Sequence, residues 1–286
     1  MDEIESLIIW MKSLYTTEAW KQEALDRIAM IGKPMVPALI GLLKETESLR
    51  DPYLQRYRYD KKHDYVSARK IALEGLMRIG IPAVLELCKI CQDSKGVSRS
   101  VAIKAIASIA KQKPLCSELS DAATMLKEMI GRNMVYREAF HKRELISSVL
   151  INECIDALGD IGDPHSFCEL AKYLMDSSLN SHAIFALEKT VAKCPNIGQL
   201  SGFDIELDRL LKSLTDEKAG SSESAKVRIC LAELRCVIAK RKNELASNRD
   251  LLLDDVPKPP KKGGMFRTLN SKPETGNGQR ISKEGG

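Results

Sequence analysis

Aromatic residues and long apolar runs are both scarce in this sequence. Phe, Trp and Tyr supply only 5% of the 286 residues, whereas Ala, Leu, Ile, Lys and Glu are abundant. The abundant types lose little rotamer freedom on a helix, so the composition favours helices. No uncharged apolar run approaches the length of a membrane span, which excludes a transmembrane helix. The balance of 44% apolar and 29% charged residues is typical of an ordered, soluble protein.

The motifs of several enzyme classes are also absent. The sequence contains no GxGxxG, Walker or GxSxG pattern, which argues against dinucleotide binding, P-loop phosphate binding and a serine-hydrolase elbow. Asp160, Asp163 and His165 fall close together and could suggest acid–base chemistry, but we expect them to be turn and cap residues. The four histidines form no HExxH or paired metal spacing; they are His63, His141, His165 and His182.

Cysteine is present, but not in a pattern that predicts a disulfide framework or a metal site. Eight cysteines are scattered through apolar positions, so we expect reduced, buried thiols. Cys88 and Cys91 form a single CxxC, whereas a structural zinc site commonly uses two such pairs. The N-terminus, Met1 to Glu5, is acidic where a secretory signal would be basic. We therefore expect a cytoplasmic protein without metal or cofactor.

The net charge of +5 is unevenly distributed. Residues 251–286 hold seven Lys or Arg against four Asp or Glu, so this segment carries +3 and the rest of the chain only +2. A nearly neutral body argues against a general nucleic-acid binder. Past residue 250, Pro, Gly, Ser, Asn and Lys dominate, and such a composition buries too little apolar surface to fold.

One internal pattern recurs along the chain. Apolar residues three apart are followed by a small residue and then by a proline within a few positions. The apolar stripe indicates an amphipathic helix, glycine closes it in the left-handed conformation, and proline is suited to the first position of the next helix. The copies are Leu25-Ile28-Ile31-Gly32 with Pro34, Leu73-Leu76-Ile79-Gly80 with Pro82, Ile103-Ile106-Ile109-Ala110 with Pro114, Ile155-Leu158-Ile161-Gly162 with Pro164, and a degenerate Ile184-Leu187-Thr190-Val191 with Pro195.

Each copy predicts a helix–turn–helix whose apolar face is buried only when neighbouring copies stack. We therefore predict an all-α fold, an α-solenoid of about five to six helix pairs. Its parts are a capping helix at 1–20, the repeats at 21–248 and a disordered basic tail at 249–286. Second helices are expected at 34–46, 82–93, 117–131, 164–176 and 204–217, followed by a weaker helix at 222–242 with Val227, Leu231, Leu234 and Ile238 in phase.

The run Ile161-Gly162-Asp163-Pro164-His165-Ser166-Phe167-Cys168-Glu169-Leu170-Ala171-Lys172-Tyr173-Leu174 resembles the HEAT-like repeat first named in phycobilisome lyases, and residues 31–40 resemble it nearly as well. The resemblance covers roughly residues 20–195. It implies an armadillo-like helical fold but no single activity, because the repeat occurs in lyases, hydroxylases and adaptors. The HEAT-repeat hydroxylases of hypusine formation carry repeated His-Glu pairs as iron ligands, and no His-Glu dipeptide occurs here.

The copies alternate between long and short spacing, since the residues that end them lie 48, 30, 52 and 29 positions apart. The extra length falls at about 46–66 and 131–147, either as recognition loops or as helix extensions. Both segments interleave Tyr with Arg and Lys, the types favoured at binding hot spots. The candidate partner-binding residues are Arg50, Tyr53, Arg56, Tyr57, Arg58, Tyr59, Lys61, Lys62, Arg132, Tyr136, Arg137, Lys142 and Arg143.

The sequence leads to three hypotheses about function. The first is a non-enzymatic scaffold or adaptor whose partner is another protein, with no membrane and no nucleic acid involved. The second, a lyase-like or chaperone-like role on a chromophore or small ligand, is implied by the resemblance alone. The third is nucleic-acid binding, because HEAT-like DNA glycosylases share this architecture. Their binding face carries tryptophans, whereas Trp10 and Trp20 here lie at the N-terminal end, where we expect the cap.

Overall fold

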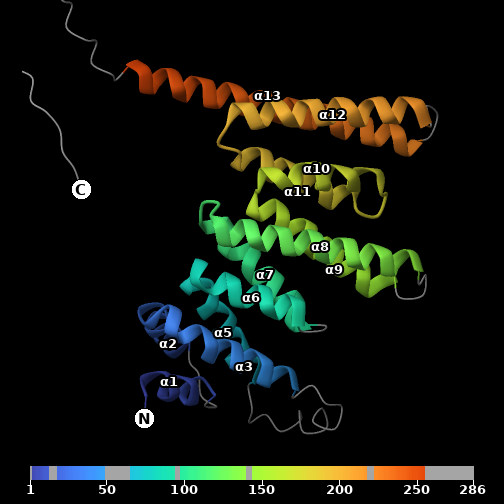
Figure 1. The fold of residues 1–286 in the computed structure, drawn as a ribbon. Coiled ribbons are helices and arrows are strands. Elements are labelled where there is room, and N and C mark those ends of the chain that lie inside the picture. The colour runs from blue at the N-terminus through green and yellow to red at the C-terminus, as the bar shows by residue number, and fades with distance from the viewer. Residues whose placement is uncertain are drawn as a thin grey trace, which may run out of the picture. The chain divides into compact units, whose positions relative to one another are not determined.

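The computed structural model describes residues 2–12, 18–48, 65–93, 97–139, 144–217 and 222–254. The chain divides into two units, residues 1–247 and residues 248–286. Over the described ranges the secondary structure is entirely helical, without a strand (Figure 1). None of the described helices is long and apolar enough to cross a membrane.

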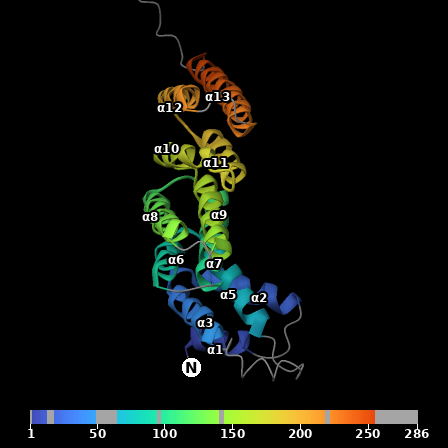
Figure 2. The same cartoon turned by 90° about the vertical axis from the view of Figure 1, so that its right-hand side faces the viewer.

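The helices of the first unit pack in sequential pairs, which confirms the predicted α-solenoid (Figure 2). Each first helix contacts the next first helix, from α2 through α5, α7 and α9 to α11, and second helices contact one another at α3–α6, α6–α8 and α10–α12. The first helices are α2 (Glu18–Ile31), α5 (Tyr65–Ile79), α7 (Val97–Gln112), α9 (Glu144–Ile161) and α11 (Asn180–Lys193). The second helices are α3 (Val36–Ser48), α6 (Ile81–Asp93), α8 (Ser117–Ala139), α10 (Phe167–Lys172) and α12 (Ile197–Glu217), with α1 (Glu3–Met11) before the pairs and α13 (Ser222–Asp254) after them.

The predicted apolar stripes form the core of this stack. The stripe of α7 is completely buried, and so is that of α9. In α2 and α11 most stripe positions are buried and the others pack partly exposed against the core. In α5 Leu76 is buried, whereas Leu73 and Ile79 pack partly exposed against the core. The α10–α12 contact adds a stacked aromatic pair, Phe167 and Phe203, with ring centroids 3.9 Å apart. The four residues predicted in phase on the last helix are buried on α13; they are Val227, Leu231, Leu234 and Ile238.

The predicted glycine ends of the helices are confirmed. Gly32, Gly80 and Gly162 have φ of 68°, 76° and 70°, in the left-handed region that favours glycine. The N–H of Gly162 donates to the carbonyl oxygen of Leu158 at 2.9 Å, and the other two glycines make the same bond four residues back. Where the sequence has Ala110 or Val191 instead, the helix continues two residues further, to Gln112 and Lys193.

The predicted start of one second helix was wrong. We expected a helix at 204–217, but α12 begins at Ile197. The additional helical residues, 197–203, include Gly198 and Gly202, although glycine is unfavourable inside a helix. The side-chain oxygen of Asn196 accepts the backbone N–H of Gly198 at 2.7 Å and so caps the start. The last helix is also longer than expected, since α13 continues to Asp254.

The longer segment predicted at 131–147 is largely helix extension. Helix α8 continues to Ala139 and α9 begins at Glu144, so only residues 140–143 of this segment lie outside the described part of the chain. The other segment, 46–66, falls mostly on residues 49–64, which are outside it as well. At the N-terminus, Trp10 of α1 meets Trp20 of α2 edge to face, with ring centroids 3.7 Å apart.

Candidate protein-binding groove

Most of the residues predicted to bind a partner lie outside the described part of the chain. Arg132 is exposed on α8, where its Nε donates to the carbonyl oxygen of Glu128 at 3.4 Å. Tyr136 and Arg137 belong to α8, but their side chains are outside the described part. The remaining candidates fall on residues outside the described ranges: Arg50, Tyr53, Arg56, Tyr57, Arg58, Tyr59, Lys61, Lys62, Lys142 and Arg143. The hypothesis that the two segments bind a partner stays a prediction.

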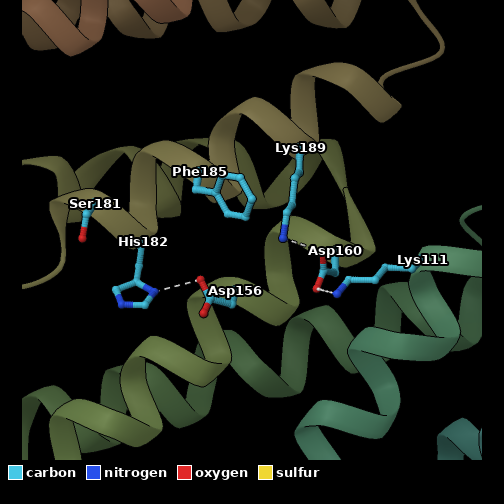
Figure 3. Close-up of a pocket in the computed structure, with 7 residues that line it drawn as sticks. All are labelled: Lys111, Asp156, Asp160, Ser181, His182, Phe185 and Lys189. Atoms are coloured by element: carbon cyan, nitrogen blue, oxygen red, sulfur yellow. Dashed lines mark hydrogen bonds and ion pairs between the residues drawn. The ribbon is translucent and has the colours of Figure 1, made fainter.

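The structure shows a different concave surface, on the row of first helices. We call it the α9–α11 groove; it has a volume of about 580 Å³. Three consecutive first helices, α7, α9 and α11, contribute its lining, as Figure 3 shows. The lining residues are Lys111, Asp156, Asp160, Ser181, His182, Phe185 and Lys189.

The two helices that form most of the groove approach each other closely because one residue has no side chain. A Cβ added to Gly159 of α9 would lie 2.5 Å from the Cα of Ala186 on α11. Glycine and alanine together therefore bring the two backbones into contact. Asp160 follows this contact on α9, so its carboxylate faces the side chains of α11.

Asp160 links three first helices although its side chain is only 6% exposed. Its Oδ1 lies 2.7 Å from Nζ of Lys189 on α11, and its Oδ2 lies 3.3 Å from Nζ of Lys111 on α7. A carboxylate this buried needs charged partners, because transfer from water is costly. Of the predicted cap residues, Asp163 does cap, accepting the N–H of His165 at 3.2 Å, whereas Asp160 instead holds neighbouring repeats together.

Lys193, at the end of α11, reaches the ends of two earlier helices. Its Nζ donates to the carbonyl oxygen of Ala110 on α7 at 2.7 Å and to the carbonyl oxygen of Asp160 on α9. Carbonyls at helix C-termini lack intrahelical partners and carry partial negative charge, so an ammonium group satisfies them. Burial lowers the pKa of Lys193, and the ammonium groups of Lys189 and Lys111 act in the same direction, while Asp160 opposes them.

The opposite end of the groove is formed by His182 and Asp156. Nδ1 of His182 lies 2.9 Å from Oδ1 of Asp156. Phe185 lies between His182 and Lys189 along α11, and its side chain is 55% exposed (Figure 3). The ammonium group of Lys189 is 4.2 Å from the centroid of the Phe185 ring, a cation–π distance. The result is an exposed aromatic ring between two polar contacts that join α9 to α11.

A second, smaller hollow lies beside the extension of α8. It has a volume of about 500 Å³ and includes Met134, Tyr173 and Met175 in its lining. The hydroxyl of Tyr173 donates to Glu169 at 2.9 Å, while Met175 and the neighbouring Val135 are half or more exposed. This hollow adjoins the segment at 131–147 that the sequence singled out.

The CxxC pair packs into the core from α6. Cys91 is buried and Cys88 half-buried, and burial raises the pKa of Cys88 to about 11 and that of Cys91 further. Cys154 and Cys194 are also buried, as predicted, but Cys168 and Cys236 are exposed, which the sequence did not indicate. Among the described residues no three His, Cys, Asp or Glu side chains gather as a metal site would require.

Comparison with known proteins finds no family. No family model matches the chain, and no curated protein matches it either. Among solved structures, the crystal structure of an engineered protein from the Northeast Structural Genomics Consortium matches 83% of this chain and 98% of its own, at 17% identity and a TM-score of 0.31. The description of the chain as an all-helical repeat protein therefore rests on its own helix packing.

Proposed function

We propose that this chain is a non-enzymatic scaffold or adaptor that binds another protein through the α9–α11 groove. The observation that carries the proposal is the exposed ring of Phe185, which lies between the Lys189–Asp160 ion pair and the His182–Asp156 contact. Aromatic residues supply a large share of binding energy at protein interfaces, particularly when surrounding contacts exclude water. His182 and Lys189 lie on either side of Phe185, so a partner that covers the ring would also meet these two side chains.

The groove is also preorganised. Because Asp160 already holds Lys111 and Lys189, a partner that meets these side chains does not have to order them. Ordering a flexible side chain at an interface costs about 0.5–1.5 kcal/mol, so fixing it beforehand improves affinity. The stack of helices adds a long continuous surface beside the groove, as is usual for solenoids that bind proteins.

Two finer points belong to the same proposal. The motif in residues 161–174 supports helix pairs of the HEAT-like type, and the free thiols support a cytoplasmic location. The Tyr- and Arg-bearing segments at 46–66 and 131–147 are proposed as further contact surfaces for the same partner. A lyase-like or chaperone-like role on a small ligand has less support, because such ligands are usually enclosed and this groove opens to solvent.

The proposal is tested by affinity purification with a groove variant and a matched control. The groove variant combines Phe185→Ala with Lys111→Glu. The control combines Leu85→Ala with Lys89→Glu on α6, where the two side chains are similarly exposed, at 59% and 56%. We expect one protein to co-purify in stoichiometric amount with the wild type and the control, but not with the groove variant. Equal recovery by both variants would remove the groove from the binding surface.

A further inference from the structure

The charges of the α9–α11 groove are not balanced at its lysine end. Lys111 and Lys189 both pair with one carboxylate, that of Asp160. Lys193 is engaged by two carbonyl oxygens at helix C-termini, whose partial negative charge it offsets. One unit of positive charge therefore remains at this end, and Lys111 carries it into solvent, since its side chain is 59% exposed.

The negative groups of the groove are less accessible to a ligand. The carboxylate of Asp160 is nearly buried, and each of its oxygens already meets an ammonium group. Asp156 is more exposed but faces His182 at 2.9 Å. A basic ligand would thus find one carboxylate, which is already in contact with the His182 imidazole, whereas an acidic ligand finds an exposed ammonium group beside an apolar ring.

The length of the groove limits what fits between its two ends. Asp156 and Asp160 are four residues apart on α9, which corresponds to about 6 Å along a helix. An extended chain advances about 3.3 Å per residue. The two polar ends of the groove are therefore separated by about two residues of an extended segment, with Phe185 between them.

We infer that the occupant of the α9–α11 groove is an extended acidic segment of a partner protein. An Asp or Glu side chain of the segment contacts Lys111 and Lys189, and a large apolar side chain one or two residues away packs on Phe185. This inference rests on the proposed function and adds the chemistry of the partner. Nucleic acid fits less well, because strands bind through many phosphate contacts and only the lysine end of the groove offers an uncompensated positive charge.

The experiment selects peptides from a random 12-residue display library on the purified full-length chain. We expect the selected peptides to place Asp or Glu within two residues of Leu, Ile, Phe or Met several times more often than the unselected library. A selected peptide, labelled and measured by fluorescence anisotropy, should bind at least tenfold more weakly to Lys111→Glu and to Phe185→Ala. The control Leu85→Ala with Lys89→Glu should bind the peptide as the wild type does. Replacing the acidic residue of the peptide by Gln should weaken its binding to the wild type by a similar factor of about ten.

The outcomes separate the inference from the proposed function. Selected peptides that need Phe185 but lack an acidic residue would overturn the inference and leave a protein-binding groove in place. Peptides that bind Phe185→Ala as tightly as the wild type, or no enrichment at all, would overturn both. A 20-nucleotide single-stranded DNA is measured in the same assay; if it binds and Lys111→Glu weakens it, while no acidic peptide is selected, nucleic acid replaces the acidic segment as the occupant.

Discussion

Gly159 on α9 lies directly against the backbone of Ala186 on α11, so close that a side chain on residue 159 would not fit between them. An added Cβ would lie 2.5 Å from the Cα of Ala186 and 2.8 Å from its Cβ. The contact fixes the separation of the two helices that form most of the groove. It therefore connects the packing of the repeats to the geometry of Asp160 and Lys189, which pair across the same interface at 2.7 Å.

The first prediction concerns this contact. Gly159→Ala should lower the free energy of unfolding by about 1–2 kcal/mol, because overpacking costs about 1–3 kcal/mol and the better helix propensity of alanine returns up to about 1 kcal/mol. Gly202→Ala on α12 is the control, since a Cβ added to Gly202 meets no neighbouring atom within 4 Å. This substitution should stabilise the protein by about 0.5–1 kcal/mol. Urea unfolding followed by circular dichroism measures both. Equal effects of the two substitutions would contradict the close contact.

The second prediction concerns Asp160. Asp160→Asn keeps the shape of the side chain but leaves Lys111 and Lys189 without a counter-charge. We expect a loss of about 1–3 kcal/mol, the range for groups buried without a satisfied partner. Asp156→Asn, at a carboxylate that is 40% exposed, should change the unfolding free energy by less than about 1 kcal/mol. If Asp156→Asn lowered the free energy of unfolding as much as Asp160→Asn, burial of the Asp160 carboxylate would not be the cause of the loss.

The repeat architecture could be predicted from the sequence because its signals are local. Gly32, Gly80 and Gly162 each close a helix, and the apolar residues that precede them are spaced within one helix. Periodicity and turn chemistry act over a few residues, so they can be read without knowing which helices become neighbours. The error at residues 197–203 is local as well, because Asn196 caps the start of α12 although glycine, unfavourable inside a helix, follows at Gly198 and Gly202.

The groove could not be predicted, because it depends on how repeats stack. Lys111, Asp160 and Lys189 belong to three different helices, and nothing in their local sequence marks them as partners. The sequence indicated that Asp160 is a turn residue, whereas in the structure its carboxylate pairs with Lys111 of α7 and Lys189 of α11. A useful signal was the pair Gly159–Asp160, since a glycine inside an amphipathic helix indicates close approach of a second backbone.

The third prediction concerns the thiols. At pH 8, a thiol with a pKa of about 11 is only about 0.1% thiolate, the form that reacts with iodoacetamide. Cys88 has such a pKa, and burial raises that of Cys154 to about 12. Exposed Cys168 and Cys236 should therefore be alkylated first in the native protein. Mass spectrometry of peptides after timed labelling measures the order, with urea-unfolded protein as the control; rapid native labelling of Cys88 would contradict it.

The last prediction concerns Lys193. Lys193→Met keeps an aliphatic chain over Gly162, whose added Cβ would lie 2.6 Å from Cδ of Lys193, but removes the donor to the carbonyl oxygens of Ala110 and Asp160. We expect a loss of about 1–2 kcal/mol for the two hydrogen bonds. Lys172→Met, at a lysine that is 65% exposed and pairs with Glu169, should cost less than about 1 kcal/mol.

The pH dependence of the same variant has a definite sign. Because the pKa of Lys193 is lower in the folded protein than the ordinary value of 10.5, the unfolded chain binds more protons between the two values. Stability from this group therefore rises with pH in that interval. The difference in unfolding free energy between the wild type and Lys193→Met should therefore widen as the pH approaches 10.5. The buried thiols lower the stability of both proteins over the same range, and since they are common to both, they do not change this difference. Urea titrations at pH 8 and pH 10 measure the difference; a gap that narrows would mean that the lysine is not buried as the structure has it.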